Sequence, residues 1–375
     1  MADWTKPFVA AYTWWRVPRS SYRARPDSGT DVGYYDIGLE TEQVTNITSG
    51  TITVNDSSET FESADVNCIG PLDIGTDLLR CKMTATWADG STETVVLGTF
   101  SVSVPSRDVR GSYEECSANL DGRLMQLATD WFDHVYTIPK GNNVGAYRSL
   151  EVRRVGITFG TMYPTVNTGV AAAQNIVWGF GTDGGSKLAW YNNLMEMMGA
   201  RAAKTDPYGR ILTLAPIDYD GTPVWSFVEG INATFLQDAT DERDTTDVCN
   251  KVIVVYEGEG ATIIGTATDD DPASAWSTVN LGFVKCAEPY SYELTDSTTQ
   301  ATANAKAAEL LATNQSVVRR VTIKHVWCGV RVGDIVTLEY PSAGISGKFA
   351  VRTMEIDVGS AGCLCTTELR RFERA

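Results

Sequence analysis

The chain has 375 residues, enough for two or three domains that each bury a core of their own. Its formal net charge of −16 disfavours a protein that grips nucleic acid through the phosphates, and 43% hydrophobic residues are typical of a soluble globular chain. No apolar stretch approaches the about 18 residues of a membrane span, and the start of the chain lacks a signal-peptide pattern. We therefore expect synthesis in a cytoplasm and no membrane anchor.

The first 25 residues mix aromatic and basic side chains. They include Trp14, Trp15, Arg16, Arg19 and Arg23. One interpretation is a docking arm for an acidic partner, which makes these five residues candidates for a partner interface. The other interpretation is an irregular sheet edge on which the two tryptophans pack. The sequence leaves both open.

Strand patterns fill residues 33–110 and predict a first β-domain, which we place at 1–115. Residues 79–87 alternate between apolar and polar side chains, and residues 88–91 have the composition of a hairpin turn. Residues 26–79 hold eleven acidic residues and no basic one. This domain is therefore expected to have one acidic flank.

Two helices are expected in a mixed α/β insert at 116–215. An apolar stripe over 119–136 predicts the first of them, with Asn119 as its N-cap. Ser186 is the expected N-cap of the second helix, over 187–199. The apolar stripe of that second helix consists of Leu188, Tyr191, Leu194, Met195 and Met198.

Residues 216–375 are expected to form a second β-domain. A capping box from Ser297 to Gln300 predicts a helix near 298–313, and strand patterns fill 317–372. One face of the first of these strands holds Val321, Ile323, His325 and Trp327. The chain is thus predicted to be a β-rich α+β protein with two β-barrel-like domains and helix-containing inserts.

No catalytic, metal-binding or cofactor-binding residue is predicted. A Ser–His–Asp arrangement needs a histidine beside a nucleophile, and the two histidines, His134 and His325, stand at positions typical of structural residues. Eight cysteines without a Cys-x-x-Cys pair are expected to be reduced and mostly buried. Paired carboxylates of a glycoside hydrolase have no distinctive setting among the 47 acidic residues.

Four pieces of the sequence resemble, in their order, the tail hub family of tailed bacteriophages, also called baseplate hub or minor tail proteins. The pieces are the transition out of the first β-domain after 97–100, the helix at 187–199 with its strand turn, the strand at 250–254, and the strands that begin at 333–336. The likeness covers roughly residues 95–372. The residues that carry it include Asp206, Gly209, Arg210, Asn250, Gly333, Asp334 and Gly347.

This resemblance implies a structural, non-enzymatic protein of the virion tail tip that needs no cofactor. In the family, a homotrimer with two β-domains per subunit forms a ring that closes the tail tube. The implied partners are the distal tail protein, the tape-measure protein and the tip or receptor-binding proteins, and phage DNA passes through the lumen without specific binding. Because like charges repel, we expect acidic residues of 26–79 and 206–296 to face this channel in part. The basic patches at 14–25 and 317–375 would face acidic partner rings.

A second class of protein stays open as an alternative. It is a carbohydrate-binding or carbohydrate-active β-protein that acts on host cell-wall glycan, with Trp14 and Trp15 as stacking platforms. The alternative predicts a monomer with affinity for glycan, whereas the tail hub predicts a threefold ring.

Overall fold

The structure, a computed structural model, describes the chain except for residues 1–2, 23–36, 111–112, 163–165, 167, 173–174, 180–184, 246–247, 259–260, 294–297, 360–362 and 375. The chain forms two compact units, Met1–Gln237 with Lys324–Thr367 and Asp238–Ile323 with Glu368–Ala375. The unit boundaries fall within strands β14 (Phe235–Asp244), β18 (Ser316–Val326) and β21 (Leu364–Arg374). The division into three domains at residues 115 and 215 stays a prediction.

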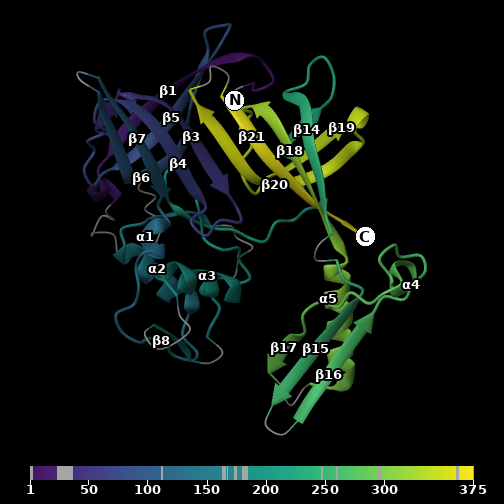
Figure 1. Ribbon diagram of the computed structural model, residues 1–375. Helices are drawn as coiled ribbons and strands as arrows, with labels where there is room; N and C mark the ends of the chain where they lie inside the picture. The colour runs from purple at the N-terminus through teal and green to yellow at the C-terminus, as the bar shows by residue number, and fades with distance from the viewer. Residues whose placement is uncertain are drawn as a thin grey trace. The chain divides into compact units, whose positions relative to one another are not determined.

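The first β-module lies in the first unit, and its neighbouring strands are antiparallel (Figure 1). It consists of β1 (Phe8–Val17), β2 (Glu42–Val44), β3 (Ile47–Asn55), β4 (Glu62–Ile69), β5 (Leu78–Trp87), β6 (Thr92–Arg110) and β7 (Tyr113–Gly122). Between β1 and β2 lies the short 3-10 helix η1 (Arg19–Tyr22). In β4, Ala64 and Val66 point into the core and Asp65 points outward, because side chains alternate along a strand. The turn predicted at 88–91 is confirmed, with Gly90 at a φ of 82° between β5 and β6.

The second β-module continues the same sheet. It consists of β13 (Trp225–Val228), β19 (Ile335–Tyr340), β20 (Ile345–Val358) and the parts of β14, β18 and β21 that belong to the first unit; the 3-10 helix η2 (Pro341–Ala343) connects β19 and β20. Strand β20 pairs with β3 of the first module, so that Met354 lies opposite Val54 and Ile356 opposite Ile52. The two modules are therefore joined by backbone hydrogen bonds. The residues of the predicted inward face are all buried, each at most 2% exposed: Val321 and Ile323 in the second unit, His325 and Trp327 in the first.

A mixed insert follows the first module within the first unit, and Figure 1 shows its helices α1, α2 and α3 below the strands of the first module. It consists of α1 (Met125–Ala128), β8 (Tyr136–Ile138), α2 (Val144–Arg154), β9 (Phe159–Met162), β10 (Ile176–Trp178), α3 (Lys187–Met197), β11 (Lys204–Thr205) and β12 (Ile211–Thr213). The prediction of α3 is confirmed. Ser186 caps it by accepting a hydrogen bond from the backbone N–H of Ala189, and Gly199 follows it at a φ of 67°.

The prediction of a helix over 119–136 is wrong. The structure describes every residue of this range. Strand β7 runs through to Gly122, and only Met125–Ala128 of this range is α-helical. Leu127 of the apolar stripe is buried, whereas Trp131 is 61% exposed. The physical reason is that β4 and β6 pair with β7 on both sides and satisfy the backbone groups that a helix would have used.

The second unit packs a helix on a small sheet. It consists of β15 (Lys251–Gly258), β16 (Ala261–Thr268), α4 (Thr278–Leu281), β17 (Tyr290–Glu293) and α5 (Gln300–Asn314), with parts of β14, β18 and β21. Helix α5 packs closely on β16 at Gly265. The approach leaves no room for a side chain there, since a Cβ on Gly265 would stand 2.3 Å from the backbone of Ala303. Its N-cap is Thr299, in a capping box with Thr302, and not the predicted Ser297, which lies outside the described residues. The β-rich α+β fold class is confirmed.

Candidate functional site

Three segments of the first unit, far apart in sequence, meet at one place that we call the junction: residues 54–62, 201–210 and 327–354. The turn between β3 and β4 supplies the first segment. In this turn Phe61 has a φ of 65° and packs, 7% exposed, in the core of the insert. The Nζ atom of Lys204 lies over the aromatic ring of Phe61, 4.9 Å from the ring centroid. The turn thus anchors the first β-module in the insert.

One buried carboxylate holds three cations of the junction together. The side chain of Asp56 is 5% exposed, with the Nζ of Lys204 at 3.2 Å from Oδ1 and a guanidinium nitrogen of Arg352 at 2.8 Å from Oδ2. Arg201 makes a further ion pair with Oδ1. Burial acts to raise the pKa of Asp56, but the charges of Arg201, Lys204 and Arg352 outweigh it and hold the pKa below its usual value. Because β20 supplies Arg352, this cluster ties the second module to the first module and the insert.

A second carboxyl group of the junction is held in the opposite state. Glu62 is 4% exposed and accepts a hydrogen bond of 2.8 Å from the hydroxyl of Thr205. It lines a cavity of about 480 Å³ whose wall includes the apolar side chains of Val330 and Met354. Burial raises the pKa of Glu62 to about 8, so the group is largely protonated at neutral pH. The cavity wall also includes basic side chains, and Arg331 among them acts to lower this pKa, but burial outweighs that effect.

The turn Asp206–Arg210 is built around its own first residue. Oδ1 of Asp206 accepts from the backbone N–H groups of Tyr208 at 3.0 Å and of Arg210 at 2.9 Å, and Oδ2 accepts from Nε of Arg210 at 2.6 Å. Gly209 has a φ of 74°, and a Cβ there would stand 2.5 Å from the side chain of Arg123. The pattern Asp-x-x-Gly-Arg thus encodes a turn that closes on itself.

A buried polar network docks this turn on the first module. Arg80, 1% exposed, donates to Oγ1 of Thr99 at 3.0 Å and to the hydroxyl of Tyr22 at 2.6 Å. The hydroxyl of Thr99 donates in turn to the carbonyl oxygen of Pro207 at 2.8 Å, and the hydroxyl of Tyr22 donates to the carbonyl oxygen of Tyr208 at 2.7 Å. Sequence reasoning missed the network, because Arg80 lies within a strand of ordinary pattern and its partners are distant in sequence. Besides the turn Asp206–Arg210, the segment at 37–40 contributes partners, with Glu40 paired to Arg80 at 3.2 Å.

The two glycines Gly209 and Gly199 offer a matched pair of substitutions. Both have a positive φ, of 74° and 67°, but a Cβ at Gly199 would meet nothing within 4 Å. Gly199→Ala is expected to lower the free energy of unfolding by about 1–2 kcal/mol, the cost of the backbone conformation alone. Gly209→Ala should cost about 2–4 kcal/mol, because Arg123 must also move. Urea unfolding measures both, and equal losses would contradict the packing of Arg123 on the turn.

The remaining residues of the family resemblance also stand at turns and irregular places of the chain. Gly333 has a φ of 99°, and Arg201 lies over it. Oδ2 of Asp334 accepts from the backbone N–H of Arg331 at 2.8 Å. Gly347, at a φ of 129°, lies opposite Leu338 in the pair β19–β20. These contacts give each residue a local role, and their meaning as a family signature stays a prediction.

Asn250 belongs to the second unit. Its Oδ1 accepts from the backbone N–H of Lys285 at 2.8 Å, and its Nδ2 donates to the carbonyl oxygen of Phe283 at 3.0 Å. The side chain therefore holds the segment between α4 and β17 against the start of β15.

The candidates for a partner interface lie in β1 and in η1. Trp14 is 3% exposed and belongs to the core, and Trp15 is half-buried. Nε of Arg16 pairs with Asp77 at 2.7 Å, and Nε of Arg19 donates to a backbone carbonyl at 2.5 Å. Arg23 lies outside the described residues. A role of these side chains in partner binding stays a prediction.

One cysteine and one histidine, Cys328 and His325, lie side by side in the first unit. Sγ of Cys328 lies 3.8 Å from Nδ1 of His325, which the geometry assigns as donor to the carbonyl oxygen of Val326 at 2.8 Å. Burial lowers the pKa of His325 to about 4 and raises the pKa of Cys328 to about 12. Both groups are neutral at pH 7, which is typical of a structural pair and not of an activated thiolate.

Within the described part of the chain, no three side chains of His, Cys, Asp or Glu are grouped to hold a metal ion. In that same part, no helix is long and apolar enough to cross a bilayer. The eight cysteines are free thiols, and only Cys286 among them is exposed.

No protein-family model matches the sequence, and no curated protein matches it. Solved structures do match. The chain is similar to the tail protein from Neisseria meningitidis MC58, with a TM-score of 0.62 and 13% identity, over 96% of this chain and 97% of that chain. It is also similar to the 43 kDa tail protein of prophage MuSo2 from Shewanella oneidensis, with a TM-score of 0.62 and 11% identity, over 97% of this chain and 100% of that one.

A further likeness is to a chain of the PdpA–VgrG complex in its lidless form. The TM-score is 0.55 and the identity 8%, over 97% of this chain and 65% of that chain. Sequence identities this low define a shared fold and no shared activity. The chain therefore has the fold of these two tail proteins, one of which comes from a prophage, and the resemblance predicted from the sequence is confirmed at that level.

Proposed function

We propose that this protein is a structural hub of a phage tail tip, a ring that closes the tail tube and lets DNA pass at infection. The observation that carries the proposal is the fold, which is similar to that of two solved tail proteins, one of them from a prophage, over 96% and 97% of the chain. The role we propose is scaffolding, without a catalytic step.

The outward face of four central strands supports a channel. Two neighbouring cross-strand rows run over β20, β3, β4 and β7, and they hold Glu355, Thr53, Ser63 and Asp121, then Asp357, Thr51, Asp65 and Asn119. The rows carry four carboxylates and no lysine or arginine, and all eight residues are exposed or half-buried. Such a face repels DNA phosphates instead of binding them, as a channel for DNA requires.

Of the four carboxylates on this face, only that of Asp65 comes from a stretch that the charge pattern singled out. Asp56 and Glu62 of the stretch 26–79 are buried in the junction, whereas Asp65 lies on the face. Glu355 and Asp357 come from the mildly basic stretch at the C-terminal end. We assign the channel-facing role to this face and not to the acidic stretches as wholes.

Three copies of the chain would close the ring, each contributing the two β-modules that the pairing of β3 with β20 joins. The junction supports this role, because a ring subunit has to keep the angle between its modules constant. The proposed neighbours are the distal tail protein, the tape-measure protein and the tip or receptor-binding proteins. Trp15, Arg16 and Arg19 are proposed contacts to these neighbours.

Imaging of the purified chain by electron microscopy, with sedimentation over a dilution series, tests this function. The expected result is a species of three times the 40.8 kDa chain mass, seen as a threefold ring. In a reconstruction of that ring, Asp65, Glu355 and Asp357 should line the bore. A monomer at every concentration, or a ring with these carboxylates on its outer rim, would contradict the proposal.

A further inference from the structure

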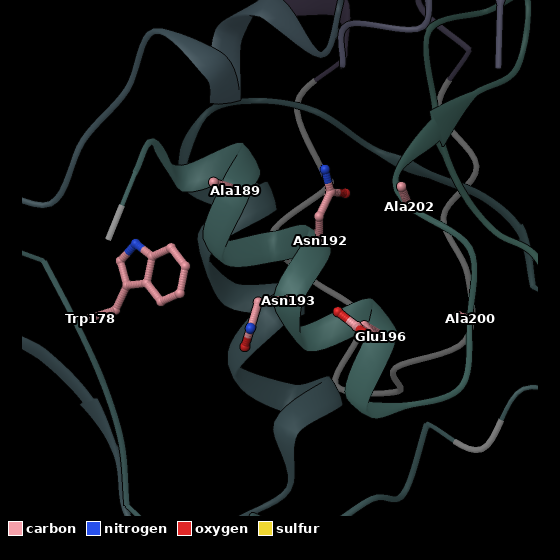
Figure 2. A pocket seen from close by; sticks show the side chains of 7 residues that line it. All are labelled: Trp178, Ala189, Asn192, Asn193, Glu196, Ala200 and Ala202. Atoms are coloured by element: carbon pink, nitrogen blue, oxygen red, sulfur yellow. The ribbon is translucent and has the colours of Figure 1, made fainter. Parts of the chain in front are cut away.

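A pocket of about 460 Å³ lies over the outward face of α3. Figure 2 shows the indole of Trp178 beside the helix, Asn192, Asn193 and Glu196 projecting from it, and Ala202 on the segment that follows. A second pocket of about 590 Å³ shares Trp178 and Asn193 with the first. Trp178 thus borders both pockets, and the size of each falls in the range of small-molecule sites.

The indole ring of Trp178 is held in one orientation. Its Nε1 donates to the carbonyl oxygen of Gly185 at 3.3 Å, and its backbone pairs with Tyr136 of β8. The next residue, Gly179, has a φ of 118° and lies so close to the carbonyl oxygen of His134 that a Cβ would stand 2.4 Å from it. Because Nε1 is already hydrogen-bonded to Gly185, the indole of Trp178 presents a fixed aromatic surface to the pocket. A ligand can bind to this surface without a rearrangement of the ring.

The helix supplies polar groups beside this ring. Its inward residues, such as Leu188, Tyr191 and Leu194, are fully buried, which turns Asn193 and Glu196 outward, one helical turn apart. Oδ1 of Asn192 accepts from the backbone N–H of Ala203 at 2.7 Å. Within the described residues, the side chains of Asn193 and Glu196 have no hydrogen-bond partner. An amide that can donate and accept and a carboxylate that can accept are therefore available to a ligand.

We infer that this pocket binds a neutral pyranose saccharide, with one sugar ring stacked on Trp178 and its hydroxyls hydrogen-bonded to Asn193 and Glu196. A pyranose has one face of C–H groups, which suits the electron-rich face of an aromatic ring, and a rim of hydroxyls that donate and accept. Ala189, Ala200 and Ala202 leave the room that larger side chains would fill.

Charge narrows the class of ligand. Glu196 lines the first pocket, and neither pocket is lined by a lysine or an arginine, so a phosphate or an acidic sugar would meet repulsion from Glu196 without a compensating cation. This inference does not rest on the proposed tail-hub function. Electron microscopy and sedimentation measure whether the chain assembles into a ring, whereas the NMR experiment below measures whether a saccharide contacts the protein. Either experiment can therefore fail without affecting the result of the other.

Saturation-transfer NMR on the full chain tests the inference with neutral trisaccharides of β-1,4-linked glucose, β-1,4-linked N-acetylglucosamine and α-1,4-linked glucose. We expect a signal from at least one of them and none from an oligogalacturonate of equal length. Trp178→Ala should weaken binding by about tenfold or more, and Trp178→Phe should retain most of it. Asn193→Ala and Glu196→Ala should each weaken it by about three- to tenfold.

Trp131→Ala is the matched control, because Trp131 is 61% exposed in the same insert but does not line either pocket. It should leave binding unchanged. Thermal unfolding is measured for every variant, and an unchanged transition is expected if the insert stays folded. The inference is overturned if no neutral trisaccharide gives a signal, if Trp178→Ala binds like the parent chain, or if tetramethylammonium displaces the sugar and binds more tightly.

Discussion

Replacing Asp56 with asparagine is expected to lower the free energy of unfolding by about 3–5 kcal/mol. The substitution leaves Arg201, Lys204 and Arg352 together around a side chain without charge, and Lys204 is only 4% exposed. Removing one partner of a buried ion pair is costly, because the remaining charges are neither hydrated nor compensated. Urea unfolding followed by tryptophan fluorescence measures the loss.

Asp65→Asn is the control for this substitution, since it removes an exposed carboxylate from β4 and should change stability by less than about 0.5 kcal/mol. The pH dependence provides a second check. Because the pKa of Asp56 is lowered in the folded protein, its stabilisation is present above the usual value of 3.8 and is lost as the pH falls through the folded value. The difference between parent and Asp56→Asn should therefore shrink in acid. Equal stability of the two at pH 7 would show that the cluster does not hold the junction.

Replacing Glu62 with glutamine is expected to stabilise the protein, and increasingly so as the pH rises from about 4.5 to 8. Burial raises the pKa of Glu62 to about 8, so the folded chain keeps a proton that the unfolded chain releases near 4.5. Between these two values the parent protein loses about 1.4 kcal/mol of stability per pH unit through this group. Glutamine keeps the shape and the acceptor for Thr205, and it does not titrate.

The measurement is the difference in the free energy of unfolding between Glu62→Gln and the parent chain at several pH values, which cancels the titration of the other groups. The difference should rise through pH 5 to 8 and level off above. Thr205→Val serves as a comparison, because it removes the hydroxyl that donates to Glu62 and leaves the carboxyl group titratable. A difference that stays constant with pH would mean that Glu62 is ionised in the folded protein.

The sequence by itself determined those parts of the protein whose physical cause is local. Ser186, the apolar stripe after it and Gly199 are enough to specify α3, because cap, periodicity and stop lie within one short segment. The turn Asp206–Arg210 closes through its own side chains in the same way. Alternating strands bounded by turn residues determined the β-rich fold class, and the order of these signals supported the likeness to phage tail proteins.

Only the tertiary structure decided what depends on neighbours distant in sequence. The apolar spacing over 119–136 fits a helix, yet pairing with β4 and β6 makes its first residues a strand. Asp56 and Glu62 stand close together in one turn, and packing alone ionises the first and protonates the second. Charge, burial and pKa are properties of an environment, and segments up to about 300 residues away build that environment here, so the sequence of the turn does not contain them.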